Sequence, residues 1–210
     1  DDFGIDLQRR NSKNPLNRFA LLKVVGDTLY WSSGFILHRF EFNAGAWHEL
    51  AGINEDNLDF GSHSIAIYTD VEVLGDTLYI VGRDAFFSKE FFEMLGYIPF
   101  DNLNEIAMSK SVFLVDIHDK NNAFFTSKID APDIDTVRVW NGNIVALGNG
   151  KISVRNPVSL VSETELPLPA SFSGFYPVRG SADLQGTLAV AAKENGVLLL
   201  NPPLAPPRNY

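Results

Sequence analysis

Charged residues stand at one repeated position of otherwise apolar runs, three residues before a turn signal. The positions are Lys23, Glu72 and Arg138, with Ala182 at the fourth. Burying an unpaired charge is expensive, so such side chains must either pair with one another or hold a ligand. In the first interpretation they form a salt-bridge plug, which Asp70 and Arg179 could join. In the second, Lys23 and Arg138 hold a small anionic ligand.

A second group of candidates is the acidic stretch that contains Asp130, Asp133 and Asp135. Three carboxylates this close in sequence could supply oxygen ligands to a hard cation. The stretch lacks the spacing and the glycine of an EF-hand loop, so a solvated acidic turn is the main interpretation. We therefore predict no metal site and no cofactor, and these three residues are the only candidate metal ligands.

The sequence shows no constellation that demands catalysis. Its four histidines have no HExxH spacing, and it contains no G-x-S-x-G elbow, P-loop or Rossmann glycine pattern. A triad of Ser62, His63 and Asp70 is disfavoured, because sequence neighbours on one strand do not normally converge. Cysteine is absent, which excludes a thiol nucleophile and a cysteine-ligated zinc site.

Composition and charge narrow the class of partner. The chain has 210 residues, of which 45% are hydrophobic, and a formal net charge of −9. An acidic chain is not expected to bind nucleic acid or an anionic membrane. No apolar run reaches the roughly 18 residues that a membrane-spanning helix needs. The absence of cysteine fits a bacterial envelope protein and a cytoplasmic one, so the compartment stays open, with an extracytoplasmic (periplasmic or cell-surface) location slightly favoured.

The elements that position these residues are four related hairpins. Each consists of an apolar alternating run, a two-residue turn signal and a second apolar run, which together indicate a β-hairpin. They occupy residues 24–31, 73–80, 139–146 and 183–190. Their turns are 49, 66 and 44 residues apart, and the long spacing falls to 39 when the strand-poor residues 84–110 are set aside. Repeats of about 40–50 residues with strand signals alone are typical of propeller blades.

Further strands are expected after each hairpin. The third strands are predicted at 35–42, 111–117, 150–154 and 196–201, and the fourth strands at 47–50, 123–126 and 160–164. The last repeat lacks a fourth strand, because the prolines that follow it resist strand pairing. The N-terminal run 3–8 alternates apolar and polar residues, so we expect it to pair with 196–201 and close the ring. The alternative is that the 210 residues are a fragment of a larger propeller.

The repeats resemble those of known propeller families. In the first repeat, a Leu-Tyr strand at 29–30 leads to Trp47, which closes the unit as in a kelch repeat. Residues 78–83 fit the same frame, although a phenylalanine at 124 or 125 replaces the closing tryptophan. Repeats three and four resemble propeller repeats of the LVIVD type, most clearly at 196–202. The resemblance implies a propeller fold and no particular activity.

We therefore predict an all-β fold, a small β-propeller of about four blades over residues 1–201, followed by a proline-rich tail at 202–210. Residues 84–110 form one insertion between the second and third strands of the second blade. Apolar residues at 87, 91, 94 and 95 follow helical spacing, which predicts a short amphipathic helix within it. This long aromatic loop could be a lid or a partner-binding knob. Alternatively, its phenylalanines pack on the rim of the blade.

The function expected of this fold is a non-catalytic binding or scaffold module. It would recognise a protein or a glycan through loops at 62–64, 83–110, 130–135 and 171–176. The candidate ligand-binding residues are Lys23, His63, Glu72, Arg83, Asp84, Phe91, Arg138 and Arg179. The alternative is a propeller hydrolase or lyase whose site lies at the channel mouth, around Arg83, Asp84, Arg138 and Arg179. A third interpretation is an envelope-anchored structural domain with residues 202–207 as a spacer.

Overall fold

The structure, a computed structural model, describes residues 21–33, 36–53, 64–85, 109–168, 180–184, 187–191 and 197–201. Every regular element in this part of the chain is a β-strand. None of the described elements is an apolar helix long enough to cross a membrane. The strands form four separate antiparallel sheets in chain order, which confirms the predicted all-β fold.

Each sheet corresponds to one predicted repeat and is called a blade. Blade 1 contains β1 (Leu22–Val25), β2 (Thr28–Ser33), β3 (Ile36–Asn43) and β4 (Ala46–Ile53). Blade 2 contains β5 (Ser64–Leu74), β6 (Thr77–Ala85), β7 (Ser109–Asp116) and β8 (Phe124–Asp130). Blade 3 contains β9 (Thr136–Trp140), β10 (Asn143–Gly148), β11 (Lys151–Arg155) and β12 (Ser162–Pro167). Blade 4 contains β13 (Gly180–Leu184), β14 (Thr187–Ala191) and β15 (Val197–Leu200).

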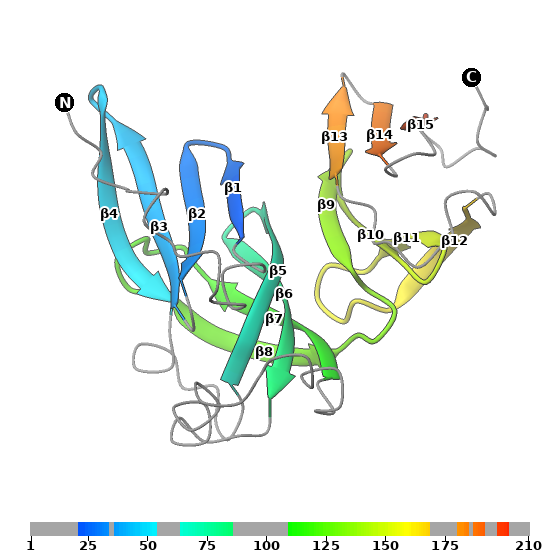
Figure 1. Cartoon of the computed structure of the whole chain (residues 1–210), viewed down its shortest axis with the longest axis horizontal. Helices are drawn as coiled ribbons and strands as arrows, with labels where there is room; N and C mark the ends of the chain where they lie inside the picture. The colour runs from blue at the N-terminus through cyan, green and yellow to red at the C-terminus, as the bar shows by residue number, and fades with distance from the viewer. Residues whose placement is uncertain are drawn as a thin grey trace, which may run out of the picture.

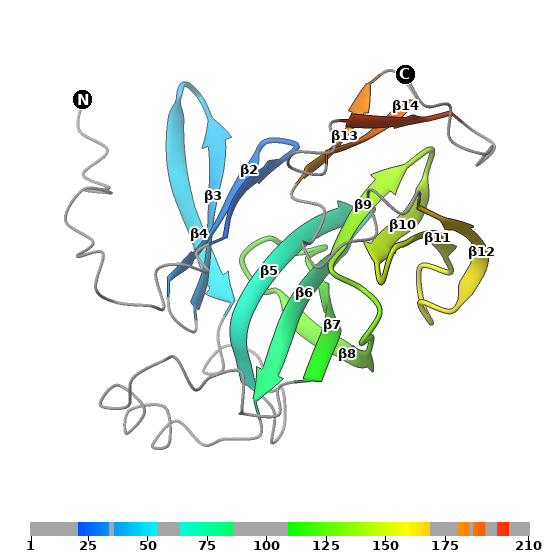
Figure 2. The ribbon, with the colours of Figure 1, turned by 45° about the vertical axis from the view of Figure 1, so that its right-hand side comes forward.

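The blades follow one another around a common centre (Figures 1 and 2). The first strand of each blade lies innermost, with β1 beside β5, β5 beside β9, and β9 beside β13. In both views the four blades form an arc whose two ends are blade 1 and blade 4. This arrangement is that of a β-propeller.

The turns of the predicted hairpins have the backbone geometry that their residues favour. The loops from β1 to β2 and from β5 to β6 are Gly-Asp pairs, in which Gly26 and Gly75 have φ values of 57° and 59°. A positive φ at the first loop residue is characteristic of a type II′ turn. In blade 3, both Asn141 and Gly142 have positive φ, which is the type I′ pattern of Asn-Gly. The hairpin prediction is therefore confirmed in the first three blades.

Apolar side chains on both faces of the blades form the core. Because successive residues of a strand point to opposite faces, Leu78 and Ile80 pack against blade 1, whereas Tyr79 and Val81 pack against blade 3. The cluster between blades 1 and 2 includes Tyr30, Leu37, Val71, Ile80 and Phe113. The next two clusters include Tyr79, Val112, Val137 and Ile144, and then Val145, Leu147, Leu188 and Val190. Blades 2 and 3 are thus packed on both faces by neighbouring blades.

The insertion in blade 2 is shorter than the predicted 84–110. Asp84 pairs with Ser109 and Arg83 with Lys110, so the ends of the predicted insertion belong to β6 and β7. Extending the ladder satisfies the backbone groups that a loop would leave to water. The helix predicted within the insertion, the closing strand at 3–8 and the tail at 202–210 lie outside the described residues. They stay predictions.

A buried arginine that the sequence did not single out joins blades 1 and 2. The Arg39 guanidinium donates to the carbonyl oxygen of Ala51 at 3.0 and 2.7 Å, and to that of Lys120 in blade 2 at 2.8 Å. Burial lowers the pKa of Arg39. Tyr30 lies opposite Arg39 in the ladder and is also buried. Burial raises the pKa of the Tyr30 hydroxyl to about 12.

We predict that the free energy of unfolding falls as the pH rises through the window between about 10 and 12. In the unfolded chain Tyr30 loses its proton near the ordinary pKa of 10.0, whereas in the folded protein it keeps the proton to about 12. The unfolded state therefore binds fewer protons in this window, and on the order of 2 kcal/mol of stability is lost across it.

The comparison that tests this is urea unfolding of wild type and Tyr30→Phe at about pH 9 and about pH 11. Phenylalanine cannot ionise, so the variant should lose less stability than wild type between the two pH values. Ionisation of lysines and of the other tyrosines affects both proteins equally and cancels. An equal loss in the two proteins would show that the Tyr30 hydroxyl does not cause the alkaline destabilisation.

Candidate functional site

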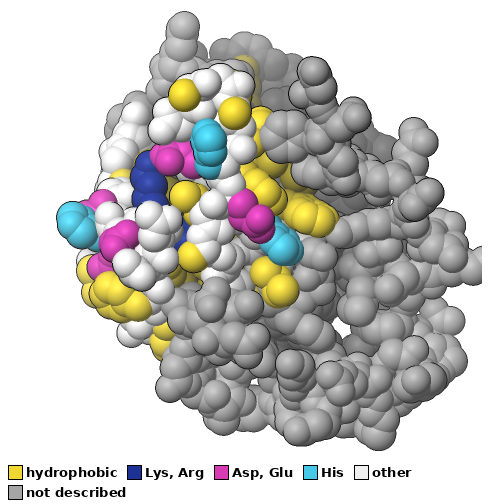
Figure 3. Space-filling model, turned by 90° about the vertical axis from the view of Figure 1, so that its left-hand side faces the viewer, with side chains coloured by type: hydrophobic (Ala, Val, Ile, Leu, Met, Phe, Trp, Pro, Cys, Tyr) yellow, Lys and Arg dark blue, Asp and Glu magenta, His cyan; other side chains and the backbone are white. Residues whose placement is uncertain are grey.

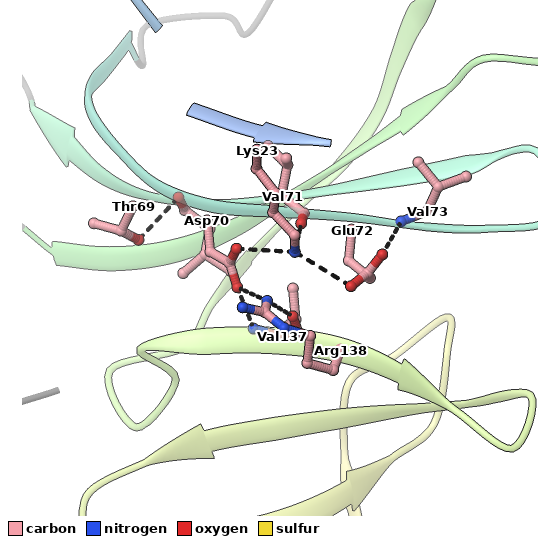
Figure 4. Close-up of polar contacts among 9 residues, drawn as sticks. Lys23, Thr69, Asp70, Val71, Glu72, Val73, Val137 and Arg138 are labelled. Atoms are coloured by element: carbon pink, nitrogen blue, oxygen red, sulfur yellow. Dashed lines mark hydrogen bonds and ion pairs between the residues drawn. The ribbon is translucent and has the colours of Figure 1, made fainter. Parts of the chain in front are cut away.

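The charged residues at the repeated position lie on three neighbouring inner strands. Lys23, Glu72 and Arg138 belong to β1, β5 and β9, and each stands opposite the third residue of the second strand in its blade. Figure 4 shows the three side chains directed into the same space between these strands. Their equal position in the repeats therefore correctly predicted that these three side chains lie close together. The side chain of Ala182, at the fourth position, lies outside the described part.

Asp70 is the residue that connects these charges. Its Oδ1 accepts a hydrogen bond from Lys23 Nζ at 3.1 Å. Its Oδ2 accepts one from the backbone N–H of Val137 at 2.9 Å and another from the Arg138 guanidinium (Figure 4). The carboxylate is buried and lies between the two cations. One side chain of β5 thus binds β1 and β9 at the same time.

Glu72 completes the group, which we call the inner charge network (Lys23, Asp70, Glu72 and Arg138). Lys23 Nζ donates to Glu72 Oε2 at 3.2 Å and also to the carbonyl oxygen of Val71. Glu72 Oε1 accepts the backbone N–H of Val73 at 3.2 Å. Two cations face two carboxylates, so the formal charges cancel within the network.

This geometry favours mutual neutralisation over the binding of a free anion. The carboxylate oxygens of Asp70 already occupy the positions that an anionic ligand would take beside Lys23 and Arg138. A ligand would have to displace a buried carboxylate, and that carboxylate would then be left without its partners. The anion site predicted at Lys23 and Arg138 stays a prediction.

A β-bulge in β5 lies directly before Asp70. The register of β5 against β6 shifts between Tyr68 and Asp70. In a regular strand, residues three apart point to opposite faces, yet Tyr68 and Val71 share the cluster between blades 1 and 2. The extra residue of the bulge allows this, and the intervening Asp70 points away from that cluster to the cations.

The acidic stretch does not converge on a single point. The Asp133 carboxylate pairs with Arg155, and that of Asp135 pairs with Lys110. Asp130 lies 3.4 Å from Lys128 Nζ and accepts a hydrogen bond from Ser111. Among the residues that the structure describes, no three acidic or histidine side chains are grouped to hold a metal ion. The three aspartates thus serve as separate ion-pair partners.

For the other candidate ligand-binding residues, the structure describes at most the backbone. Arg83 and Asp84 lie in β6, the second strand of blade 2, and their side chains are not described. His63, Phe91 and Arg179 lie outside the described residues. Of the eight predicted ligand-binding residues, the structure therefore brings together Lys23, Glu72 and Arg138 and leaves the rest untested.

Sequence reasoning missed the central role of Asp70 and the burial of Arg39. The signal for Asp70 was its position two residues before Glu72, which places both carboxylates on one face of the strand. The signal for Arg39 was its place two residues after Leu37, in phase with the buried side of β3. Neither signal identifies the partners, because these come from other strands and other blades.

Comparison with known proteins supports the fold and assigns no family. No protein-family model and no curated protein matches the chain. The chain is similar to the solved structure of Bacteroides ovatus Xyloglucan PUL GH43B, with 12% identity over 91% of this chain and 40% of that chain and a TM-score of 0.55. At this identity the likeness shows the propeller fold alone.

Two further solved structures are similar at lower TM-scores. BamB from Moraxella catarrhalis is 11% identical over 89% of this chain and 46% of its own, with a TM-score of 0.48. Kluyveromyces lactis Hsv2 is 14% identical over 86% of this chain and 47% of its own, with a TM-score of 0.42. The chain thus spans less than half the length of each of the three structures. The kelch and LVIVD repeat types stay predictions.

We predict that Asp70→Asn lowers the free energy of unfolding by about 3–5 kcal/mol. The substitution keeps the shape of the side chain but removes the negative charge, so the partly buried cations Lys23 and Arg138 lose the counter-charge that they share. Urea unfolding followed by circular dichroism measures the loss. The matched control is Glu165→Gln, which breaks an exposed ion pair with Lys151 and should lower the free energy of unfolding far less, because water screens an exposed pair. If the two substitutions lowered the free energy of unfolding equally, the prediction that Asp70 is a major contributor to stability would be wrong.

Proposed function

We propose that the protein is a non-catalytic binding module that recognises a protein or a glycan through one face of the propeller. The observation that carries this proposal is the unequal length of the connections on the two faces. Strands alternate in direction within each blade, so connections after second and fourth strands leave one face, and those after first and third strands leave the other. We call the former the long-loop face.

The long-loop face is joined to the longest connections of the chain. Residues 54–63, 86–108 and 168–179 link the strands that end and begin there. Between the described strands of the opposite face, the longest connection is 117–123, and several are two-residue turns. Long connections on a rigid β-scaffold are where proteins commonly place their binding residues.

The composition of these connections suits partner recognition. Six aromatic residues lie within 86–108 and three within 168–179. Aromatic side chains are the main anchors of protein interfaces, because they offer a large contact area at low conformational cost. Aromatic rings also provide flat apolar surfaces for sugar rings, so the same residues are compatible with a glycan.

The alternative, a hydrolase or lyase at the channel mouth, has less support. Of the residues that it needs, Arg138 alone has a described side chain, and Asp70 already binds it. The inner charge network leaves none of its four charges without a counter-charge. A catalytic acid or base requires a group that can exchange its proton with substrate, and this balanced network offers no such group.

A loop-exchange variant tests the proposal. Because Asp84 pairs directly with Ser109, residues 85–108 can be replaced by Asn-Gly, the turn that joins β9 to β10. The control is Val158→Ser, which alters an exposed side chain on the opposite face. Calorimetry with xyloglucan oligosaccharides tests the glycan arm. Affinity enrichment, followed by titration of the purified candidate, tests the protein arm.

We expect wild type and Val158→Ser to bind the partner equally, and the loop-exchange variant to bind at least about tenfold more weakly. Undiminished binding by a folded loop-exchange variant would overturn the assignment to the connection 86–108. Turnover of 4-nitrophenyl glycosides by wild type, abolished in Arg138→Gln, would replace the binding module by the enzyme alternative.

A further inference from the structure

Three oxygen atoms of β5 surround the ammonium group of Lys23. Lys23 Nζ donates to Asp70 Oδ1 at 3.1 Å and to Glu72 Oε2 at 3.2 Å (Figure 4). It also donates to the carbonyl oxygen of Val71, which lies between these two residues in the chain. A lysine ammonium has three N–H donors and no acceptor, so the number of oxygens equals the number of donors. We call this set of three oxygens the β5 oxygen site.

The two carboxylates of the β5 oxygen site are buried and held by contacts within blades 2 and 3. Asp70 is 3% exposed and Glu72 is 8% exposed. The second oxygen of Asp70 accepts hydrogen bonds from the backbone N–H of Val137 and from the Arg138 guanidinium. The second oxygen of Glu72 accepts the backbone N–H of Val73. Blades 2 and 3 therefore orient the oxygens, and blade 1 supplies the cation.

The charge at the β5 oxygen site requires a cation. Asp70 and Glu72 carry two negative charges, of which Arg138 balances one through its ion pair with Asp70. Without the Lys23 ammonium, the inner charge network would keep one uncompensated negative charge in a space with little water, which is costly.

The arrangement of the three oxygens selects the kind of cation. An ammonium group is compact and can direct its three donors to three oxygens around one nitrogen. A guanidinium is planar, so its donors cannot converge in this way. A quaternary ammonium has the charge but no N–H group. The β5 oxygen site is thus matched to a primary ammonium.

We propose that the β5 oxygen site is a binding site for primary ammonium groups, and that Lys23 occupies it as the chain's own ligand. A small primary amine takes the same place when the Lys23 side chain is removed, because blades 2 and 3 still orient the carboxylates. The site lies among the inner strands, so it is independent of the binding function proposed for the long-loop face.

Chemical rescue of Lys23→Ala tests this inference. Its thermal melting is measured in methylammonium chloride and in tetramethylammonium chloride, both at an ionic strength of about 0.2 M, so that screening is equal. A ligand that binds the folded state raises the melting temperature. Lys23→Ala should melt about 2–4 °C higher in methylammonium than in tetramethylammonium. Wild type should melt at the same temperature in both salts, because Lys23 fills the site.

The matched control is Lys120→Ala, which removes an ammonium group from the surface. The Lys120 side chain is 55% exposed and pairs with a single carboxylate, that of Glu41. Figure 3 shows basic and acidic side chains beside one another at the surface on the blade 1 side. Water competes for the groups of such pairs, so methylammonium should not rescue this variant. An equal rise in Lys120→Ala and Lys23→Ala would overturn the inference, because it would be a general effect of the salt.

A covalent form of the test applies even if Lys23→Ala does not fold. Lys23→Cys introduces the only thiol of the chain. In urea, its thiolate attacks the CH₂ carbon of bromoethylamine, forms a C–S bond and releases bromide, which leaves a side chain that ends in a primary ammonium. Iodoacetamide reacts in the same way, releases iodide and leaves a neutral amide of similar length.

After removal of urea, the aminoethylated protein should melt within about 2 °C of wild type taken through the same treatment. The protein treated with iodoacetamide should melt at least about 4 °C lower, because its side chain lacks the charge. Equal melting temperatures of the two modified proteins would overturn the inference, since the site would then require bulk and not an ammonium. Failure of the aminoethylated protein to regain stability would overturn it as well.

Discussion

The structure depends on one constraint, which is that neighbouring blades must cover one another's apolar faces. Leu78 and Ile80 on one side of β6 and Tyr79 and Val81 on the other are all buried, each pair against a different blade. Full burial of one such side chain contributes about 1.5–3 kcal/mol, whereas an exposed ion pair contributes about 0–1 kcal/mol. Packing each blade on the next buries these faces, and the blades follow one another in chain order around a centre.

The same constraint creates the inner charge network. Packing blade on blade brings the inner strands together, and the charged residues of β1, β5 and β9 then meet in a space with little water. Removing these charges from water costs free energy, and Asp70 offsets that cost by pairing with both Lys23 and Arg138. The network thus links three blades through polar contacts where the apolar clusters end. Because the positive and negative charges of this network neutralise one another, we expect a partner to bind at the long-loop face and not among the inner strands.

Much of the fold and a part of the site could be predicted from the sequence. The hairpins around Gly26, Gly75 and Asn141 follow from alternation and turn chemistry, which are local properties. The meeting of Lys23, Glu72 and Arg138 follows from their equal position in the repeats. The length of the insertion in blade 2 could not be predicted, because residues 84–85 and 109–110 have no strand pattern of their own and extend the ladder only when paired.

The sequence by itself determined most of the strands, the hairpin turns and the four repeats of this chain, because each depends on residues close together in the chain. Tertiary structure alone decided the partners. Asp70 of β5 meets two cations that belong to other blades, and Asp130, Asp133 and Asp135 pair with three different basic residues. The reason is that an ion pair needs atoms within a few ångströms of each other, and only the packing of blades sets those distances.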